Sequence, residues 1–227
     1  MSLGLFVTGT DTHVGKTRVA TALCHAFAAR GLRVAAMKPV ASGCTATPAG
    51  LRCDDALALR GATNVQVAYG DLNPYAFESP IAPHIAAAAA GGAIDFEVLD
   101  LAFERQHNLS DVIVVEGAGG WLVPLDAHRS MADLAVRWNL EVVLVVGLRL
   151  GCLNHALLTA ESIGSRDVRM RGWIANTIDP DFERRDEYIL TLQNRIAAPC
   201  LGILEYAPQA TSESIAQALS STLFAAA

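Results

Sequence analysis

Short apolar runs alternate with helix-length segments along the chain. Val112–Val115 and Val142–Val146 are apolar throughout, which is typical of strands buried on both faces of a parallel sheet. The pattern predicts strands at Leu3–Thr8, Arg33–Met37, Val112–Glu116, Glu141–Val146, Gly172–Asn176 and Cys200–Leu204. It predicts helices at Lys16–Arg30, Asp54–Leu59, Asp95–Gln106, Met131–Trp138, Leu153–Ser165, Phe182–Ile196 and Ser212–Phe224. Because strands and helices alternate, we expect an α/β fold with a mostly parallel central sheet and helices on both faces.

The composition fits a single domain. The chain has 227 residues, and 52% of them are hydrophobic, which is enough to bury a large core. No linker rich in Pro, Gly or Ser divides the sequence, so residues 1–227 are predicted to form one domain. The alanine-rich patch Ala86–Ala90 is predicted to be a helix followed by a turn.

Charge and cysteine usage narrow the class of protein. The 17 Lys and Arg residues against 23 Asp and Glu residues give a net charge of −6, so we expect no nucleic-acid partner. No stretch approaches the ~20 apolar residues of a membrane span. Residues 1–4 lead directly into a strand, so we expect no signal peptide either. The five cysteines form no Cys-x-x-Cys pair, so we interpret them as reduced thiols that pack in the core. These observations together predict a cytoplasmic protein.

A polar loop, Thr8–Thr17, joins the first predicted strand to the first predicted helix. Backbone N–H groups at such a helix start face an anion, and the helix dipole favours it. Lys16 is placed to reach the β- and γ-phosphates of a nucleotide, and the Thr17 hydroxyl to bind Mg²⁺. The spacing is irregular, because Gly9 stands one residue too early and Thr10 holds the usual glycine position. The loop predicts binding of ATP or GTP with Mg²⁺.

Two carboxylates are candidate metal ligands. Glu116 directly follows four apolar strand residues, where a charged group is costly unless it is used. Mg²⁺ prefers such oxygen ligands together with phosphate oxygens and water. Asp55 has two open interpretations, as a metal ligand or, with Asp54, as the cap of a helix.

A second lysine, Lys38, follows the second predicted strand and should lie on the same sheet edge as Lys16. Two lysines beside one triphosphate suggest that negative charge develops there during a reaction, so both are candidate catalytic residues. The alternative is a surface lysine. Ser42, in the loop that follows, is on its own more typical of a turn.

The loop Gly9–Thr17 resembles that of dethiobiotin synthetases, whose pattern is Gly-Thr-Asp-Thr-x-Val-Gly-Lys-Thr. Other segments similar to this family follow along nearly the whole chain, in the family's order. They are Lys38–Gly43, Asp55–Leu57, Asn73–Tyr75, Pro83–His84, Glu116–Trp121, Gly151–His155 and Gly172–Asn176. Each segment alone could be coincidence, but their shared order and spacing make the resemblance specific.

The resemblance implies an ATP-dependent cyclo-ligase of biotin biosynthesis with Mg²⁺ as cofactor. Its substrates would be 7,8-diaminopelargonic acid, CO₂ or bicarbonate, and ATP. One amine captures CO₂ as a carbamate, the carbamate attacks the γ-phosphate, and the second amine closes a ring and releases phosphate. Such a reaction needs flanking cations and positioning more than a proton-shuttling base, which suits Lys16 and Lys38.

The resemblance also implies a set of site residues. The metal ligands are Thr17, Asp55 and Glu116. The substrate-binding residues are Thr12, Lys38, Ser42, Gly151, Cys152, Leu153 and Asn154, of which the last four begin a helix that reaches across a homodimer interface. Without the family, that segment would be an ordinary helix start. The nucleotide-binding residues are Thr12, His13, Val14, Gly15, Lys16, Thr17, Arg18, Asp55, Glu116, Gly117, Ala118, Gly119, Asn176, Thr177, Glu205, Tyr206 and Ala207.

The adenine end of the site is the least determined. The Asn176 amide offers a donor and an acceptor for a base, and the alternative is a simple turn role. Glu205–Ala207 stands before Pro208, where the family has a proline directly after the strand, so the match is positional only. His13 occupies a position that is often acidic in the family, and a solvated loop residue is favoured over a pH-dependent role.

Two other functions remain as alternatives. Switch ATPases of the partition or septum-positioning type usually carry a second lysine near the loop start, where this chain has Thr10 and Asp11. They also tend to have basic or amphipathic surfaces. Amidating synthetases of the cobalamin pathway carry an added glutaminase domain, for which 227 residues leave no room.

Overall fold

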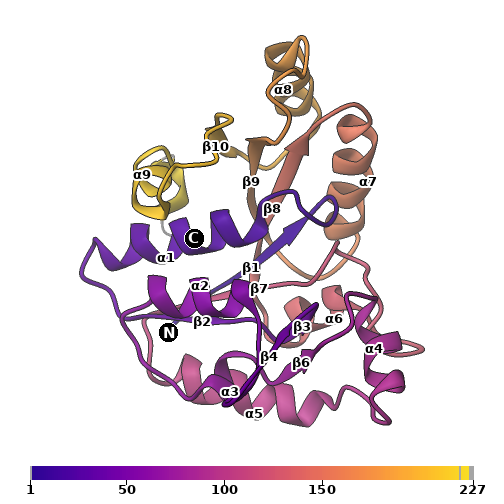
Figure 1. Ribbon diagram of the computed structural model, residues 1–227. Coiled ribbons are helices and arrows are strands. Elements are labelled where there is room, and N and C mark those ends of the chain that lie inside the picture. The colour runs from indigo at the N-terminus through magenta and orange to yellow at the C-terminus, as the bar shows by residue number, and fades with distance from the viewer. Residues whose placement is uncertain (1, 220, 225–227) are drawn as a thin grey trace.

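A computed structural model describes residues 2–219 and 221–224 of the chain (Figure 1). Its centre is a six-stranded sheet in the order β10-β9-β8-β1-β7-β2, and every neighbouring pair is parallel. The strands are β1 (Leu3–Gly9), β2 (Val34–Met37), β7 (Val112–Glu116), β8 (Glu141–Leu148), β9 (Met170–Thr177) and β10 (Cys200–Leu204). β7 and β2 lie on one side of β1, and β8, β9 and β10 lie on the other, so the strand order reverses at β1. Ligands of parallel sheets bind beyond the carboxyl ends of the strands at such a reversal.

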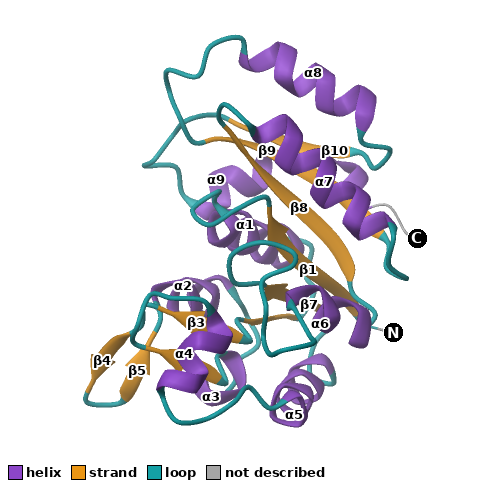
Figure 2. Cartoon of the chain, turned by 90° about the vertical axis from the view of Figure 1, so that its right-hand side faces the viewer, coloured by secondary structure: helices purple, strands orange, loops and turns teal. Residues whose placement is uncertain are grey.

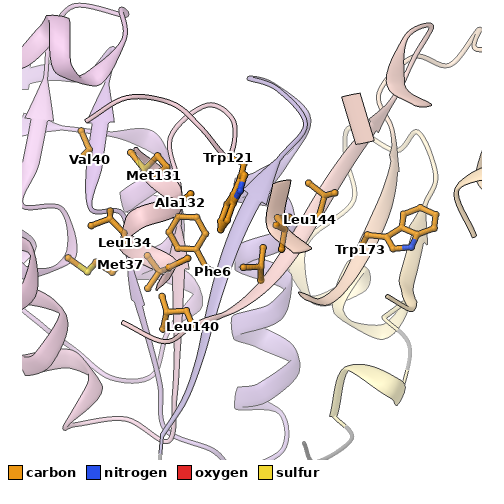
Figure 3. Packing of buried hydrophobic residues seen from close by; sticks show 14 of the residues in the cluster. Phe6, Met37, Val40, Trp121, Met131, Ala132, Leu134, Leu140, Leu144 and Trp173 are labelled. Atoms are coloured by element: carbon orange, nitrogen blue, oxygen red, sulfur yellow. The ribbon is translucent and has the colours of Figure 1, made fainter. Parts of the chain in front are cut away.

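Helices cover both faces of this sheet, because alternate strand residues point to opposite sides and both sets are apolar (Figures 1 and 2). Leu5 and Val7 of β1 point to one face of the sheet. The helices that cover this face are α1 (Lys16–Ala28), α2 (Asp54–Ala62) and α9 (Ser212–Gln217). Phe6 packs on the other, against α5 (Phe96–His107), α6 (Met131–Arg137), α7 (Cys152–Gly164) and α8 (Arg185–Arg195). In that second core the rings of Phe6 and Trp121 meet edge to face at 6.0 Å (Figure 3).

Residues between β2 and α5 form a smaller structural region beside the carboxyl end of the sheet. Two pairs of short strands lie here. β3 (Val40–Ser42) pairs in parallel with β6 (Tyr75–Phe77), and β4 (Thr45–Thr47) forms an antiparallel hairpin with β5 (Gly50–Arg52). The hairpin lies at the outer edge of the molecule (Figure 2). Two short helices complete the region, α3 (Tyr69–Leu72) and α4 (Pro83–Ala89).

The predicted α/β fold is confirmed, and the bounds of β7 and β10 are as expected. The prediction of one helix over Ser212–Phe224 is wrong, because α9 ends at Gln217 and a separate 3₁₀ helix, η1, spans Ser221–Phe224. Ser220, between them, lies outside the described residues. Leu219 and Leu223, on either side of the break, are both buried in the core. The alanine-rich patch is helical through Ala89, as predicted.

None of the helices in the described ranges is long and apolar enough to cross a membrane.

Candidate functional site

The loop after β1 turns back over the start of α1. Gly15 is the N-cap of α1 and has a φ of 94°. The Lys16 ammonium group donates a hydrogen bond to the backbone oxygen of Asp11, with an N–O distance of 2.9 Å. Burial, followed by the positive charge of Lys38, lowers the pKa of Lys16 to about 8. The loop therefore holds a buried amine and a helix N-terminus together, which suits an anionic ligand.

Asn176 supports this loop from the end of β9. Its Nδ2 donates a hydrogen bond to the backbone oxygen of Val14 at 2.8 Å, and the residue is 2% exposed. A Cβ on Gly15 would lie 2.2 Å from that nitrogen, and a Cβ on Gly9 would lie 2.5 Å from Val14 Cγ2. The close approach at Gly9 explains why the glycine stands there while Thr10 is tolerated at the next position.

We expect Gly15→Ala to weaken ADP binding and to lower the unfolding temperature more than Gly31→Ala does. Both glycines have a left-handed backbone, with φ of 94° and 79°, which costs other residues roughly 1–2 kcal/mol. Only at Gly15 does the new methyl group also meet a side chain, since nothing lies within 4 Å at Gly31. Thermal unfolding and calorimetric ADP binding of both variants test this. Equal losses would show that the contact with Asn176 does not hold the loop.

A buried lysine joins two carboxylates at the carboxyl ends of β2 and β7. Lys38 Nζ lies 2.8 Å from Asp55 Oδ2 and 2.7 Å from Glu116 Oε1. The Thr17 hydroxyl oxygen lies 2.8 Å from Asp55 Oδ1 and 2.8 Å from Glu116 Oε1. The side chains of Lys38 and Glu116 are 4% and 1% exposed. Four residues far apart in the sequence thus form one network, which we call the Lys38 cluster.

The charges in the Lys38 cluster shift the pKa of each member. Burial raises the pKa of Glu116, and Lys38 opposes this shift without reversing it. Burial also raises the pKa of Asp55, but Lys38 outweighs it, so the net pKa lies below its usual value. Burial lowers the pKa of Lys38, whereas Glu116 and Asp55 raise it and prevail. The pKa of Lys38 is therefore shifted upward, whereas that of Lys16 is shifted downward.

A cleft of about 760 Å³ opens over the Lys38 cluster and the loop Thr8–Thr17, which we call the phosphate loop. Thr12, His13, Arg18, Ser42, Ala118 and Gly119, all predicted site residues, are among the residues that line it. His13 has a left-handed φ of 60° and an exposed side chain. The Ser42 hydroxyl is buried without a hydrogen-bond partner among the described residues. The cleft is large enough for a nucleotide and has an unused polar group for a second ligand.

The predicted adenine end lies outside the cleft lining. Val14 is a core residue, 1% exposed, and takes part only through its backbone oxygen. Thr177 is buried, and its hydroxyl, like Asn176 Oδ1, lacks a hydrogen-bond partner in the part of the chain described. The backbone oxygen of Ala207 accepts a hydrogen bond from Arg18 at 2.7 Å, which ties residue 207 to the first turn of α1. Tyr206 is exposed, and Glu205 forms an ion pair outside the cleft.

Residues 151–154, which the resemblance implies as substrate-binding, are also absent from the cleft lining. Gly151 is the N-cap of α7 with a φ of 92°, and Cys152 is buried beneath the helix start. Gly117 contributes only its backbone oxygen, which lies 3.3 Å from Lys38 Nζ. Within a single chain, residues 151–154 therefore do not reach the cleft over the Lys38 cluster.

Two parts of the site are not among the site residues predicted from the sequence. Arg149 follows β8 and forms an ion pair with Asp11 of the phosphate loop. An arginine beyond a strand's carboxyl end was the available signal. Pro80–Pro83 forms part of the cleft wall. Its position depends on the short strands after β2, which leave no periodic pattern.

The donor set of the Lys38 cluster fits Mg²⁺. Asp55, Glu116 and Thr17 offer the hard oxygens this ion prefers. Glu116 Oε2 is buried and has no hydrogen-bond partner among the described residues, so it can accept a cation. Over residues 2–219 and 221–224, no three His, Cys, Asp or Glu side chains gather into a metal site. Two carboxylates and a hydroxyl instead suit an ion that takes its other oxygens from phosphate and water.

Known proteins are similar to this chain in sequence over nearly its whole length. A family model described as an AAA domain matches residues 3–214. The ATP-dependent dethiobiotin synthetase BioD of Xanthomonas oryzae pv. oryzae (strain PXO99A) is 50% identical over 214 residues, which cover 94% of this chain and 96% of the relative. The chain belongs to the ATP-dependent dethiobiotin synthetase family. The BioD of Pseudomonas paraeruginosa is 52% identical over 198 residues, 87% of each chain. The resemblance inferred from the motifs is confirmed.

Solved structures share the fold. The septum site-determining protein MinD of Pyrococcus horikoshii, complexed with Mg-ADP, aligns with a TM-score of 0.56 at 16% identity, over 98% of this chain and 94% of that one. The MinD cell division protein of Aquifex aeolicus aligns with a TM-score of 0.57 at 17% identity, over 94% and 87%. Identities this low show the fold alone. Because relatives at about half identity are dethiobiotin synthetases, the switch-ATPase alternative is not favoured.

Proposed function

We propose that this protein is an ATP-dependent dethiobiotin synthetase that converts 7,8-diaminopelargonic acid and CO₂ to dethiobiotin. The observation that carries the proposal is the Lys38 cluster, with Lys38 Nζ 2.8 Å from Asp55 and 2.7 Å from Glu116 beneath one cleft that Lys16 also lines. Half identity to proteins of that name over nearly the whole chain supports it. A cleft lined by two lysines suits a reaction in which two anions meet.

The reaction proceeds in three steps. One amine of the substrate adds to CO₂, loses a proton and becomes a carbamate. A carbamate oxygen attacks the γ-phosphorus of ATP, the bond to the β-phosphate oxygen breaks, and ADP leaves. The second amine attacks the carbamate carbon and loses a proton, phosphate departs with the bonding electrons, and the cyclic urea forms. Each step brings anions together or moves negative charge, so positioning and fixed cations supply most of the acceleration.

The two lysines divide this work. Lys16, with its pKa lowered to about 8, binds the β- and γ-phosphates once it leaves the Asp11 oxygen. Lys38, held by Asp55 and Glu116, presents a fixed positive charge to the carbamate and the transferred phosphoryl group. Mg²⁺, held by Thr17, Asp55 and Glu116, would neutralise phosphate charge there.

The substrate carboxylate requires a second copy of the chain in this proposal. Residues 151–154 begin α7 and are not in the cleft lining, so a homodimer would bring the helix start of one copy to the cleft of the other. A helix N-terminus stabilises a carboxylate through free N–H groups and its dipole.

For the adenine base of ATP, the candidate contacts are Asn176 and residues 205–207. Asn176 would act through its unpartnered Oδ1, and residues 205–207 through the Ala207 backbone beside Arg18.

We expect phosphate release only when MgATP, diaminopelargonic acid and bicarbonate are all present. The γ-phosphate has no acceptor without the carbamate, and water is a poorly positioned substitute. A continuous phosphate assay with each component omitted in turn measures this. ATP hydrolysis that does not depend on the diamine, or that DNA or lipid vesicles stimulate, would contradict the proposed function.

A further inference from the structure

Two cysteines face each other at the base of the β4–β5 hairpin. The hairpin register pairs Thr45 with Arg52, so Cys44 and Cys53 are the next opposing residues. Both thiols are free and buried, with the residues 4% and 6% exposed, and they belong to the same core cluster. Burial, followed by the neighbouring Cys53 thiol, raises the pKa of Cys44 to about 11.

The backbone geometry at this pair is that of a non-hydrogen-bonded position. The Cys44 N–H donates to the backbone oxygen of Phe77 at 2.9 Å, and the Cys53 N–H donates to the Tyr69 hydroxyl at 2.8 Å. Neither N–H therefore bonds across the hairpin. Opposing residues of this kind have Cα atoms about 4.5 Å apart, which lies within the range of about 4.4–6.8 Å that disulfides span.

We propose that Cys44 and Cys53 form a reversible disulfide that controls the position of Asp55 in the binding site. Cys53 is the N-cap of α2, two residues before Asp55, and Cys44 stands two residues after Ser42. A disulfide draws two sulfur atoms from contact distance to about 2.05 Å. The bond also ties Cys53, at the start of α2, to the strand that follows Ser42. In this proposal the tie changes the alignment of Asp55 with Thr17 and Lys38, which it meets at 2.8 Å each in the reduced protein.

Hydrogen peroxide is the oxidant in this proposal. One thiol gives a sulfenic acid and water, and the second thiol then displaces hydroxide from that sulfur. The hydroxide takes up the proton of the second thiol to give a second water. Two thiols and one peroxide thus yield one disulfide and two waters, and dithiothreitol reverses the change by exchange.

Peptide mapping tests the bond itself, independently of the proposed function. Trypsin cleaves after Arg52, so the disulfide would join residues 34–52 to residues 53–60. We expect this linked pair in peroxide-treated full-length protein, its loss on reduction, and its absence from both Cys44→Ser and Cys53→Ser. Separate sulfinic acids on the two cysteines, or a bond to Cys200 instead, would overturn the proposal.

The coupling to Asp55 rests on the proposed function for its activity readout, but not for its binding readout. We expect oxidised wild-type protein to bind MgADP at least about 10-fold more weakly and to lose diamine-dependent phosphate release, with both restored by dithiothreitol. Cys44→Ser and Cys53→Ser should keep both after peroxide. Unchanged MgADP affinity in protein that carries the disulfide would overturn the coupling. Reduced protein without diamine-dependent turnover would instead count against the proposed function.

Discussion

Lys38→Met is expected to lower turnover by about 10²- to 10³-fold while MgADP binding is retained. The methionine fills a similar volume but removes the fixed cation that faces the carbamate and phosphoryl group, and loss of one such electrostatic contact costs about this much in rate. Steady-state kinetics and calorimetric ADP binding measure the two quantities. The exposed ion pair of Arg33 with Asp111 supplies a control, since Arg33→Met should leave turnover unchanged.

The same variant should be less stable at neutral pH. Removing one partner of a buried pair costs about 3–5 kcal/mol, because the remaining charge is uncompensated. Burial already raises the pKa of Glu116, and loss of Lys38 raises it further. A group with a raised folded-state pKa destabilises the fold as pH rises through that pKa, so the deficit should shrink as pH is lowered from neutral. Lys38→Met with Glu116→Gln should recover stability but not turnover. Turnover within a few-fold of wild type in Lys38→Met would remove Lys38 from the mechanism.

Glu116→Gln is expected to raise the Mg²⁺ concentration needed for half-maximal activity by about tenfold or more, since each 1.4 kcal/mol of binding free energy is a factor of ten. The amide has the shape of the carboxylate but lacks its charge, and it leaves one carboxylate, Asp55, in the donor set. Activity and ADP binding are measured against Mg²⁺ concentration. Turnover at saturating Mg²⁺ should fall as well, because Lys38 loses its shortest ion pair, at 2.7 Å.

The matched control is Glu104→Gln, which makes the same change on the exposed face of α5. It should show the Mg²⁺ dependence of the wild type. If Glu116→Gln also keeps the wild-type dependence in both activity and ADP binding, Glu116 is not a metal ligand.

The central sheet could be predicted because its strands are buried on both faces. Val112–Glu116 and Cys200–Leu204 have the bounds that their apolar runs indicate. Helix ends were less accurate, as at α8, which begins at Arg185 rather than Phe182, because the point where a helix starts depends on local capping. Arg184 has a left-handed φ of 56° there, which no sequence pattern signals.

The region between β2 and α5 could not be predicted in the same way. Its strands are three residues long, too short for period-two alternation to stand out. β3 and β6 are far apart in the sequence and pair only because the region packs beside the sheet. The Pro80–Pro83 wall of the cleft and the Cys44–Cys53 pair both depend on this packing, so neither was anticipated.

The Lys38 cluster was predictable because its members follow strands or begin helices at one sheet edge. Lys38 and Glu116 directly follow apolar runs, and Thr17 follows the phosphate loop. Asp55 was ambiguous by sequence alone, and its contacts at 2.8 Å with Thr17 and Lys38 favour the cluster over a cap. Arg149 was missed, because an arginine after a strand is also typical of a solvated surface.

The most direct test of the proposed chemistry follows one carbon atom. Protein incubated with ¹³C-bicarbonate, diaminopelargonic acid and MgATP should yield dethiobiotin in which the ureido carbon alone is labelled, with one ADP formed for each product molecule. Mass spectrometry and ¹³C NMR of the product give both answers. ADP formed without a labelled cyclic urea, or a product that forms equally well without ATP, would contradict the assignment of this site to carbamate phosphorylation and ring closure.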